Sequence, residues 1–477
     1  WNKRDAEDFA AFDIEFDFFY KTSSQENRQF VQDVFKKLEH ANHIYENEII
    51  QFYCNNDKKF LPDRYVIGTC PYCKSEEQYS DLCEKCGRVP EEIENPHCSI
   101  CGQPPVKEKT THYFFKLKNF SEKLSQYLEE NQNLQKDVKK YVQNWIKEGL
   151  TDWDITRDIS WGIPVPIDGV NDKVFYGWFD NHLAYISSAV KFLNDNGKDG
   201  KKFWNESDIY HFIGKDIVYH HYLFLPAMRL GIEGEYKLPD YIPTRGHLTL
   251  QSKKISKSRN WYIGLKDFLQ IFPADYLRFY LVSINPYSQD DLNFDWNEFA
   301  TKINSELIGN LGNLVNRVLG FTVKSFDGII PEPEEFDDAD KESEKLIKEF
   351  VTEIGTLMEQ NHLDRALKKI FQFSAHFNQY FQHKEPWKNN PGTNSCIYLS
   401  VNAVRSLAIA IYPFLPESSQ KIWVQLGMHD NISAQGFDEI SNISIKQGHK
   451  LGKISPLFQK VEESVIKEQS AKLGDSM

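Results

Sequence analysis

The residues best suited to phosphate chemistry form one short basic segment, Lys253-Lys254-Ile255-Ser256-Lys257-Ser258, which Arg259 follows. Its lysines and hydroxyls suit a polyphosphate. Lysines on a mobile loop can follow negative charge onto a departing pyrophosphate, and so stabilise a transition state more than the bound ground state. Taken alone, the segment also fits a solvated basic loop.

Four cysteines have the spacing of a structural metal site. Cys70-Pro-Tyr-Cys73 and Cys83-Glu-Lys-Cys86 are separated by nine residues. Each pair can hold a metal through a tight turn, and two pairs complete a tetrahedron. Gly87 provides backbone freedom for such a turn. We therefore predict a structural Zn²⁺ here; free or redox-active thiols are the alternative.

A third pair, Cys98-Ser-Ile-Cys101, needs two further ligands. Cys54 and Asp57 are the candidates upstream, because aspartate can bind zinc through oxygen. A second structural zinc site and a remnant knuckle held by hydrophobic contacts both remain open. Neither metal is expected to do chemistry, because a closed four-ligand site leaves no position for water.

Composition limits the possible classes of protein. A chain of 477 residues should contain two to four domains, and 40% hydrophobic content can supply their cores. The net charge of −13 argues against a general electrostatic grip on nucleic acid, so any RNA binding must be local. No run approaches the roughly 18 apolar residues of a membrane helix, so no membrane is expected. Paired cysteines favour metal in a reducing cytosol over disulfides.

Helical and strand-like patterns alternate in the first part of the chain. Ser23 and Glu26 form a plausible capping box before a helix, and residues 120 to 149 are typical of an amphipathic helix. Strand-like runs occupy residues 174 to 179 and 208 to 214. This alternation favours a parallel α/β sheet with its ligand site at the carboxyl ends of the strands.

The second part of the chain is helical from about residue 299 almost to residue 430, and a polar tail follows from about Gly436. Five apolar residues are spaced as one buried stripe of a bundle helix: Ile303, Leu307, Leu311, Leu314 and Val318.

The segment from Lys254 to Ser258 closely resembles the second signature of class I aminoacyl-tRNA synthetases. Neighbouring segments resemble methionyl-tRNA synthetases, and with them the resemblance covers essentially the whole chain. The cysteine pattern is most similar to the archaeal and eukaryotic branch. The similar segments span residues 60 to 64, 153 to 158, 176 to 185 and 212 to 221.

The resemblance implies an α/β fold: an incomplete Rossmann-type parallel-sheet catalytic domain with a zinc-knuckle insertion, then an α-helical bundle that binds the anticodon. A His-Ile-Gly-His type motif, which family members carry near their start, does not occur in the sequence, so we expect a chain lacking that N-terminal part. The expected domains are 1–49 (catalytic, first half truncated), 50–111 (zinc knuckles), 112–245 (catalytic, second half), 246–300 (signature loop and stem contact), 301–435 (anticodon binding) and 436–477 (tail).

The implied activity is that of a methionine--tRNA ligase. ATP, with Mg²⁺, activates methionine to methionyl-adenylate, and the methionyl group then passes to the 3′ end of tRNA(Met). Lys254 and Lys257 are the expected catalytic residues, and both bind ATP together with Ser256. A cytoplasmic monomer is expected.

Three further residues are expected at the ATP. Lys215 and Asp216 follow a predicted strand, where they can hold the adenosine side. By resemblance, Arg157 lies near the phosphates. A surface ion pair is the alternative for Asp216 and Arg157.

Trp178, Tyr185 and His221 occupy positions similar to the methionine-contacting residues of the family. An aromatic pocket with one polar group near the sulfur suits a thioether side chain. Ordinary core packing is the alternative for each. The segment Asn181-His182-Leu183-Ala184 departs from the Ala-Pro-Ile-Gly of many relatives, so the family pattern does not fix the pocket's shape.

Asn310, Asn313 and Arg317 share one helix face, and Trp387 follows a proline. Such side chains can bond base edges or stack on an unpaired base. Asn313, Arg317 and Trp387 are similar to positions that read the CAU anticodon in the family. A polar helix face with a packed tryptophan is the alternative.

Two other functions remain open: a non-catalytic tRNA-binding paralogue, and the larger piece of a split synthetase. A pure RNA-binding protein has no use for Lys254, Lys257, Trp178 or His221, so their presence favours an enzyme or a part of one.

Overall fold

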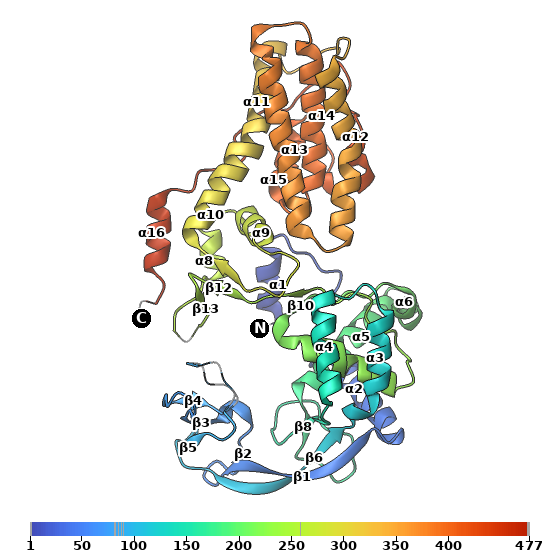
Figure 1. The fold of residues 1–477 in the computed structure, drawn as a ribbon, viewed down its shortest axis with the longest axis vertical. Coiled ribbons are helices and arrows are strands. Elements are labelled where there is room, and N and C mark those ends of the chain that lie inside the picture. The colour runs from blue at the N-terminus through green and yellow to red at the C-terminus, as the bar shows by residue number, and fades with distance from the viewer. Residues whose placement is uncertain are drawn as a thin grey trace. The chain divides into compact units, whose positions relative to one another are not determined.

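The computed structural model describes residues 2–80, 83, 85, 86, 88, 90–257 and 259–474; Gly87 and Ser258 lie outside this range. The chain forms two compact units. We call Phe16–Pro243 the N-terminal unit, and Lys3–Glu15 with Thr244–Met477 the C-terminal unit. Figure 1 shows the elements of both.

A long antiparallel ribbon organises the sheet of the N-terminal unit. Strand β1 (Ile44–Cys54) pairs with β6 (Val106–Phe115) from Ile44 opposite Phe115 to Tyr53 opposite Val106. Strands β2 (Lys59–Phe60) and β7 (Trp153–Asp154) complete the order β2-β1-β6-β7. The cysteine-rich insertion, with β3 (Val66–Thr69), β4 (Gln78–Tyr79) and β5 (Glu94–Cys98), connects the two arms of the ribbon.

Helices pack beside this ribbon around one core that includes the buried rings of Phe35, Phe115, Phe179 and Phe224. Helix α2 packs on α5. The helices and remaining short strands are α2 (Gln25–His40), α3 (Ser121–Glu130), α4 (Lys136–Glu148), β8 (Thr156–Arg157), β9 (Val174–Phe175), α5 (Gly177–Asp195), α6 (Gly200–Glu206), β10 (Ile213–Gly214), the π-helix η4 (His220–Phe224) and α7 (Leu225–Gly231).

Two local predictions were wrong. The cap of α2 is Ser24, whose hydroxyl accepts from the Asn27 backbone N–H at 3.1 Å, and not Ser23. The helix expected over residues 120–149 is two helices. Asn131 is extended, and its side-chain amide donates to the carbonyls of Pro239 and Asp240, both at 3.1 Å, so a distant segment ends α3.

The C-terminal unit contains a parallel strand pair, β12 (Leu248–Leu250) with β14 (Leu292–Phe294). Strand β13 (Lys253–Lys254) joins β12 as an antiparallel hairpin. In the N-terminal unit, a parallel bridge joins Tyr210 to Tyr241. The mixed α/β fold is confirmed, although its parallel pairing is limited to short pieces.

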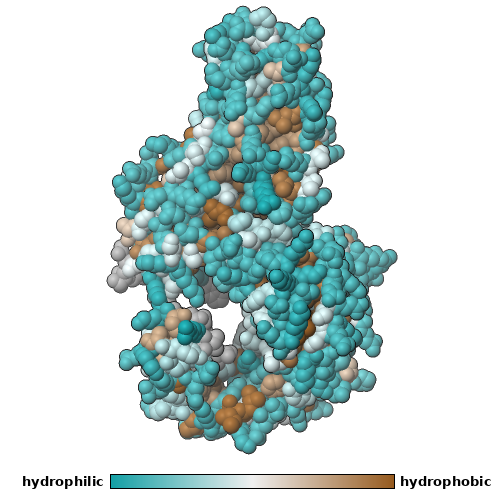
Figure 2. Space-filling view, viewed as in Figure 1, coloured by the Kyte–Doolittle hydropathy of each residue, from teal (hydrophilic) through white to brown (hydrophobic). Residues whose placement is uncertain are grey.

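A helical bundle forms the rest of the C-terminal unit, and the predicted stripe from Ile303 to Val318 is buried in its core. The part of the bundle surface visible in Figure 2 is mostly hydrophilic. The helices are α1 (Asn2–Ala10, within this unit from Lys3), α8 (Leu265–Leu269), α9 (Ala274–Ser283), α10 (Trp296–Lys302), the π-helix η5 (Ile303–Gly312), α11 (Asn313–Phe326), α12 (Asp338–Glu359), α13 (Leu363–Lys384), α14 (Thr393–Ile411), α15 (Pro416–Gln425) and α16 (Glu463–Ala471).

Helix α14 is long and apolar enough to cross a membrane by length and composition, which sequence inspection missed. However, 89% of its apolar window is buried inside the protein. It contacts α13, α12, α11 and α15. A helix buried among four others in this way is the central helix of a bundle.

The segment after Gly436 is not the polar tail that composition indicated. Ile440, Ile445, Leu451 and Val461 are buried in the bundle core. The Asn402 side chain exchanges two hydrogen bonds with the Ile445 backbone, at 3.0 and 3.1 Å. The buried apolar residues of this segment are too widely spaced to show a helical period, so the sequence pattern wrongly predicted a polar tail.

Gly246 lies where two backbone segments approach each other closely, just before β12. A Cβ added there would lie 1.9 Å from the Asp290 carbonyl oxygen. Backbone atoms cannot move away as a flexible side chain can, so only glycine fits this position.

Replacing Gly246 by Ala should therefore lower the free energy of unfolding by about 1–3 kcal/mol, because the new methyl group separates the β12 and β14 segments. Gly320→Ala is the control, since its Cβ would meet nothing closer than Asn316 Oδ1 at 4.0 Å within α11. It should be neutral or stabilising by up to about 1 kcal/mol. Equal urea midpoints for both variants would contradict this account.

Candidate functional site

The first cysteine group has the donors of a closed metal site. The sulfurs of Cys70 and Cys86 lie 3.8 Å apart, and those of Cys73 and Cys83 lie 3.6 Å apart. All four sulfurs lie within 4.8 Å of one another. Four converging thiols on two tight turns fit the donor set of a structural zinc.

The second group contains the four residues that the sequence proposed. Asp57 Oδ2 lies 3.3 Å from the sulfur of Cys54 and 3.2 Å from that of Cys98. The sulfur of Cys101 is 3.5 Å from that of Cys54. The donors again lie within 4.8 Å of one another, so these residues could also hold a metal ion.

The basic segment emerges from a tight hairpin between β12 and β13. Its turn residues, Gln251 and Ser252, both have positive φ, at 49° and 60°. Three contacts fix this unusual turn: Gln251 N–H to the Phe294 carbonyl at 2.8 Å, Ser252 N–H to Asn293 Oδ1 at 2.6 Å, and Trp296 N–H to Gln251 Oε1 at 3.0 Å. The base of the segment is therefore rigid.

Beyond the hairpin the lysines are exposed. Ser256 and Trp261 exchange backbone hydrogen bonds at 2.8 and 2.9 Å, which close the loop. Lys254 and Lys257 are exposed, and neither forms an ion pair with another described residue. These two cations are thus available to a bound anion.

Trp178, Tyr185 and His221 belong to one cluster of rings in the N-terminal unit. Trp178 and Tyr185 lie on α5, and His221 lies on η4. The Tyr185 hydroxyl is 3.2 Å from His221 Nε2. His221 Nδ1 is 3.0 Å from the Ile217 carbonyl, which can only accept, so Nδ1 carries the proton and Nε2 accepts from Tyr185.

The π-helix that carries His221 has a local cause. Pro226 has no N–H to continue the regular ladder, and Leu225 N–H donates five residues back to the His220 carbonyl. The extra residue in the turn brings both His220 and His221 to the ring cluster.

Burial keeps the histidines of the cluster neutral. It lowers the pKa of His220 and of His221 to about 4, with smaller contributions from neighbouring charges. Burial also lowers the pKa of His182 and of His211 well below its usual value. At neutral pH the cluster therefore presents uncharged imidazoles.

Lys215 and Asp216 begin a short 3-10 helix directly after β10. This position at a strand end is the one the sequence predicted for them. Lys215 and Asp216 belong to the N-terminal unit, and Lys254 and Lys257 belong to the C-terminal unit.

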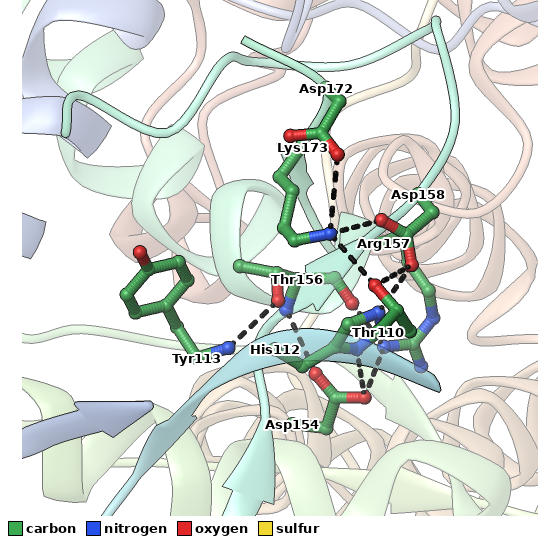
Figure 3. Close-up of polar contacts among 9 residues, drawn as sticks. All are labelled: Thr110, His112, Tyr113, Asp154, Thr156, Arg157, Asp158, Asp172 and Lys173. Atoms are coloured by element: carbon green, nitrogen blue, oxygen red, sulfur yellow. Dashed lines mark hydrogen bonds and ion pairs between the residues drawn. The ribbon is translucent and has the colours of Figure 1, made fainter. Parts of the chain in front are cut away.

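Arg157 is held by a buried charge network (Figure 3). Its guanidinium lies 3.3 Å from Asp154 and 3.8 Å from the centre of the Tyr176 ring, and it donates to the Thr156 carbonyl at 2.6 Å. The predicted cation is thus fixed in position from three sides.

His112 lies at the centre of this network, on β6. Its Nδ1 is 2.7 Å from Asp154 and its Nε2 is 2.8 Å from Asp158. Asp158 also pairs with the buried Lys173, which donates to Thr110 at 3.0 Å. Burial opposes a charged ring, but hydrogen bonds and attraction from the two carboxylates raise the pKa of His112 above its usual value.

The proposed anticodon residues lie along the contact between η5, α11 and α13. Asn313 donates to Asn378 at 2.8 Å, and Arg317 donates to Gln382 at 2.9 Å. The Arg317 guanidinium is 5.9 Å from the centre of the Trp387 ring, which is 45% exposed. Asn310 donates to the Phe371 carbonyl at 2.9 Å.

Sequence reasoning missed His112, Lys173 and His182. His112 and Lys173 both pair with Asp158, which lies more than ten residues away from each of them in the sequence. No local sequence pattern reveals such pairs. His182 was noted only as a departure from the family pattern. Its burial among other rings is visible only in the fold.

The charge on His112 predicts a dependence of stability on pH. A raised folded pKa means that the stabilisation is complete below the unfolded value of about 6.5 and is lost as pH rises through the folded pKa. Replacing His112 by Gln should lower the free energy of unfolding by about 1–3 kcal/mol at low pH, because it removes a charged donor that Asp154 and Asp158 share, although Arg157 and Lys173 remain as their partners. In urea unfolding at several pH values, the difference in free energy of unfolding between wild type and the variant should become smaller as pH rises. A difference that becomes larger would contradict a charged His112.

Two family models match the chain. Residues 1–319 match the model for tRNA synthetases class I (M), and residues 330–476 match the anticodon binding domain of methionyl tRNA ligase.

Curated relatives from archaea have the printed name "Methionine--tRNA ligase". That of Methanopyrus kandleri is 40% identical over 98% of this chain and 70% of its own length. That of Pyrococcus furiosus is 40% identical over 95% of this chain and 64% of its own length. The chain thus spans about two thirds of these relatives.

Solved structures of Mycobacterium tuberculosis methionyl-tRNA synthetase share the fold. The free form has a TM-score of 0.75 at 23% identity, covering 95% of this chain and 85% of that chain. The complex with methionyl-adenylate has a TM-score of 0.77 at 23% identity, covering 96% and 86%. With a family model over residues 1–319 and 40% identity to archaeal relatives, the chain belongs to the methionyl-tRNA synthetase family of class I.

Proposed function

We propose that this chain acts as a methionine--tRNA ligase: it activates methionine with ATP and transfers the methionyl group to the 3′ end of tRNA(Met). One observation carries the proposal. Lys254 and Lys257 are exposed beyond a hairpin whose turn is fixed by β14, in a chain 40% identical to archaeal "Methionine--tRNA ligase". A fixed hairpin followed by two exposed lysines suits the stabilisation of negative charge that develops on the leaving pyrophosphate during the reaction.

In the first step, the methionine carboxylate attacks the α-phosphorus of ATP, and pyrophosphate leaves. Lys257 and Lys254 stabilise the charge on the leaving pyrophosphate, with Ser256 beside them. Arg157 faces the phosphates, and Lys215 and Asp216 hold the adenosine side. Positioning and charge carry such phosphorus chemistry, so the chain needs no nucleophile of its own.

Trp178, Tyr185 and His221 form the methionine pocket. In the second step, a ribose hydroxyl of the terminal nucleotide takes the methionyl group from the adenylate. Mg²⁺ accompanies the ATP and offsets the charge of its phosphates.

Asn313, Arg317 and Trp387 read the CAU anticodon. The half-exposed indole of Trp387, next to a guanidinium, offers an unpaired base a stacking surface beside a hydrogen-bond donor. Asn310 supports them through its bond to α13. The partners are thus tRNA(Met), ATP and methionine, for a cytoplasmic monomer without membrane contact.

Both cysteine groups hold structural zinc. Cys70, Cys73, Cys83 and Cys86 hold one ion, and Cys54, Asp57, Cys98 and Cys101 hold the other. Four protein ligands close each site, so zinc would fix the insertion without taking part in the reaction.

Replacing Lys257 by Ala should slow methionine-dependent exchange of pyrophosphate into ATP by roughly 10²–10³-fold, because a preorganised charge is lost where negative charge develops. Binding of tRNA should change little. Lys345→Ala, which removes an exposed lysine of α12, is the control and should exchange normally. Unchanged exchange in the Lys257 variant would exclude its assigned role. A wild-type chain that binds tRNA but shows no exchange would favour the non-catalytic paralogue or a split enzyme.

Metal analysis tests the second zinc. The purified chain should contain two zinc ions, and Asp57→Ala should contain one, because the carboxylate is one of four donors. Asp57→Cys should restore the second ion. Two ions in Asp57→Ala would show that Asp57 is not a ligand, and a wild-type chain without zinc would exclude both sites.

A further inference from the structure

His182 has an unusual environment for a polar side chain. It is 1% exposed, and its ring lies close to the rings of the three proposed methionine-contacting residues. Its ring centre lies 4.9 Å from that of His221, 5.6 Å from that of His220, 5.7 Å from that of Trp178 and 6.4 Å from that of Tyr185. His182 is therefore the common neighbour of the rings that form the pocket.

Both nitrogens of His182 lack a hydrogen-bond partner among the residues that the structure describes. A neutral imidazole has one N–H donor and one acceptor, and leaving either unmet in a buried site costs about 1–3 kcal/mol. Nδ1 of His220 and Nε2 of His211 are unpartnered in the same way. Three histidines of the ring cluster therefore have unmet nitrogens, and His182 alone of the three has both unmet among the described residues.

Ordinary core packing does not explain this arrangement. Buried polar groups in folded proteins nearly always find partners, and those that do not need an explanation. The buried Arg229 cannot accept from the His182 N–H, because a guanidinium is a donor only. Its Nη1 donates to the Lys237 carbonyl at 2.6 Å, and its Nε and Nη2 are unpartnered among the described residues. The donor of His182 therefore remains available to a molecule that enters the pocket.

The other two polar side chains of the proposed pocket, Tyr185 and His221, already bond to each other. His221 Nε2 accepts a hydrogen bond from the Tyr185 hydroxyl, because the proton of this ring is on Nδ1 and is donated to the Ile217 carbonyl. While this pair is intact, Tyr185 cannot donate to a ligand. Among the rings of the cluster, His182 is the fully buried one with both nitrogens unpartnered, within the described part of the chain.

We propose that His182 is a specificity-determining residue: its N–H donates a hydrogen bond to the heteroatom in the side chain of the bound amino acid. The pocket then selects a side chain with an acceptor, a thioether or an ether, over a hydrocarbon of the same shape. The inference rests on the proposed function, because it assumes that Trp178, Tyr185 and His221 receive the amino acid.

Three amino acids of similar shape differ in how well the atom at the sulfur position accepts a hydrogen bond. A thioether sulfur is a weak acceptor, an ether oxygen is a stronger one, and a methylene group is none. Norleucine, which has a methylene in place of sulfur, leaves the His182 donor unmet. O-methylhomoserine, which has an ether oxygen there, meets it.

Isothermal titration of the full chain with methionine, norleucine and O-methylhomoserine tests this. His182→Phe removes both nitrogens but keeps a flat ring, and His182→Asn keeps one donor and one acceptor. In His182→Phe, the preference for methionine over norleucine should fall by roughly threefold to tenfold, the worth of one hydrogen bond. The preference for the ether over norleucine should fall at least as much, and His182→Asn should restore part of both.

His376→Phe is the matched control. It also removes a partly buried imidazole, one bonded to Ser343 in the bundle, and it should leave all three affinities unchanged. Far-UV circular dichroism and thermal unfolding check that each variant folds.

The outcomes separate the two claims. Wild type that prefers methionine, with the preference lost in His182→Phe and not in His376→Phe, supports the inference. Wild type that binds methionine, with equal preferences in His182→Phe, overturns the inference and leaves the proposed function standing. Wild type that binds none of the three amino acids overturns both, because the pocket is then misassigned.

Discussion

A buried polar group needs a hydrogen-bond partner, and the arrangement of this protein depends on how that requirement is met. His112 shows the satisfied case. Both of its nitrogens reach carboxylates, and the network extends to Lys173 and Arg157, so the β1–β6 ribbon and the segment with Arg157 are fixed to each other (Figure 3). Removing one member leaves buried charge behind, which costs more than the pair itself contributes.

The need for hydrogen-bond partners also separates the residues that hold the fold from those proposed to bind substrate. The turn at Gln251 and Ser252, with positive φ at both residues, is held by hydrogen bonds to β14 and to the start of α10, and the proposed catalytic lysines follow it. His182 is the opposite case, since its nitrogens remain unmet among the described residues. Both π-helices, η4 and η5, carry residues proposed for function, His221 and Asn310. An extra residue in a helical turn often marks such places.

Local patterns predicted much of this protein, and long-range contacts account for the rest. Cysteine spacing predicted two groups of donors, and the structure brings each group together, including Asp57. The apolar stripe from Ile303 to Val318 is buried because its period is that of a helix. The break at Asn131 could not be predicted, because Pro239 and Asp240 cause it. Neither could the surroundings of His182, which depend on how α5 meets η4. The domain boundaries and the roles of the site residues remain predictions.

We propose that one chain both activates methionine and recognises the RNA that receives it. Charging of two tRNA transcripts that differ only in the anticodon tests both parts at once. We expect methionine to be transferred to the transcript with CAU, and transfer to the transcript with a changed anticodon to be far slower, because the contacts of Arg317 and Trp387 are then lost. Equal transfer to both would contradict anticodon reading by the bundle, and transfer to neither would contradict the proposed ligase activity.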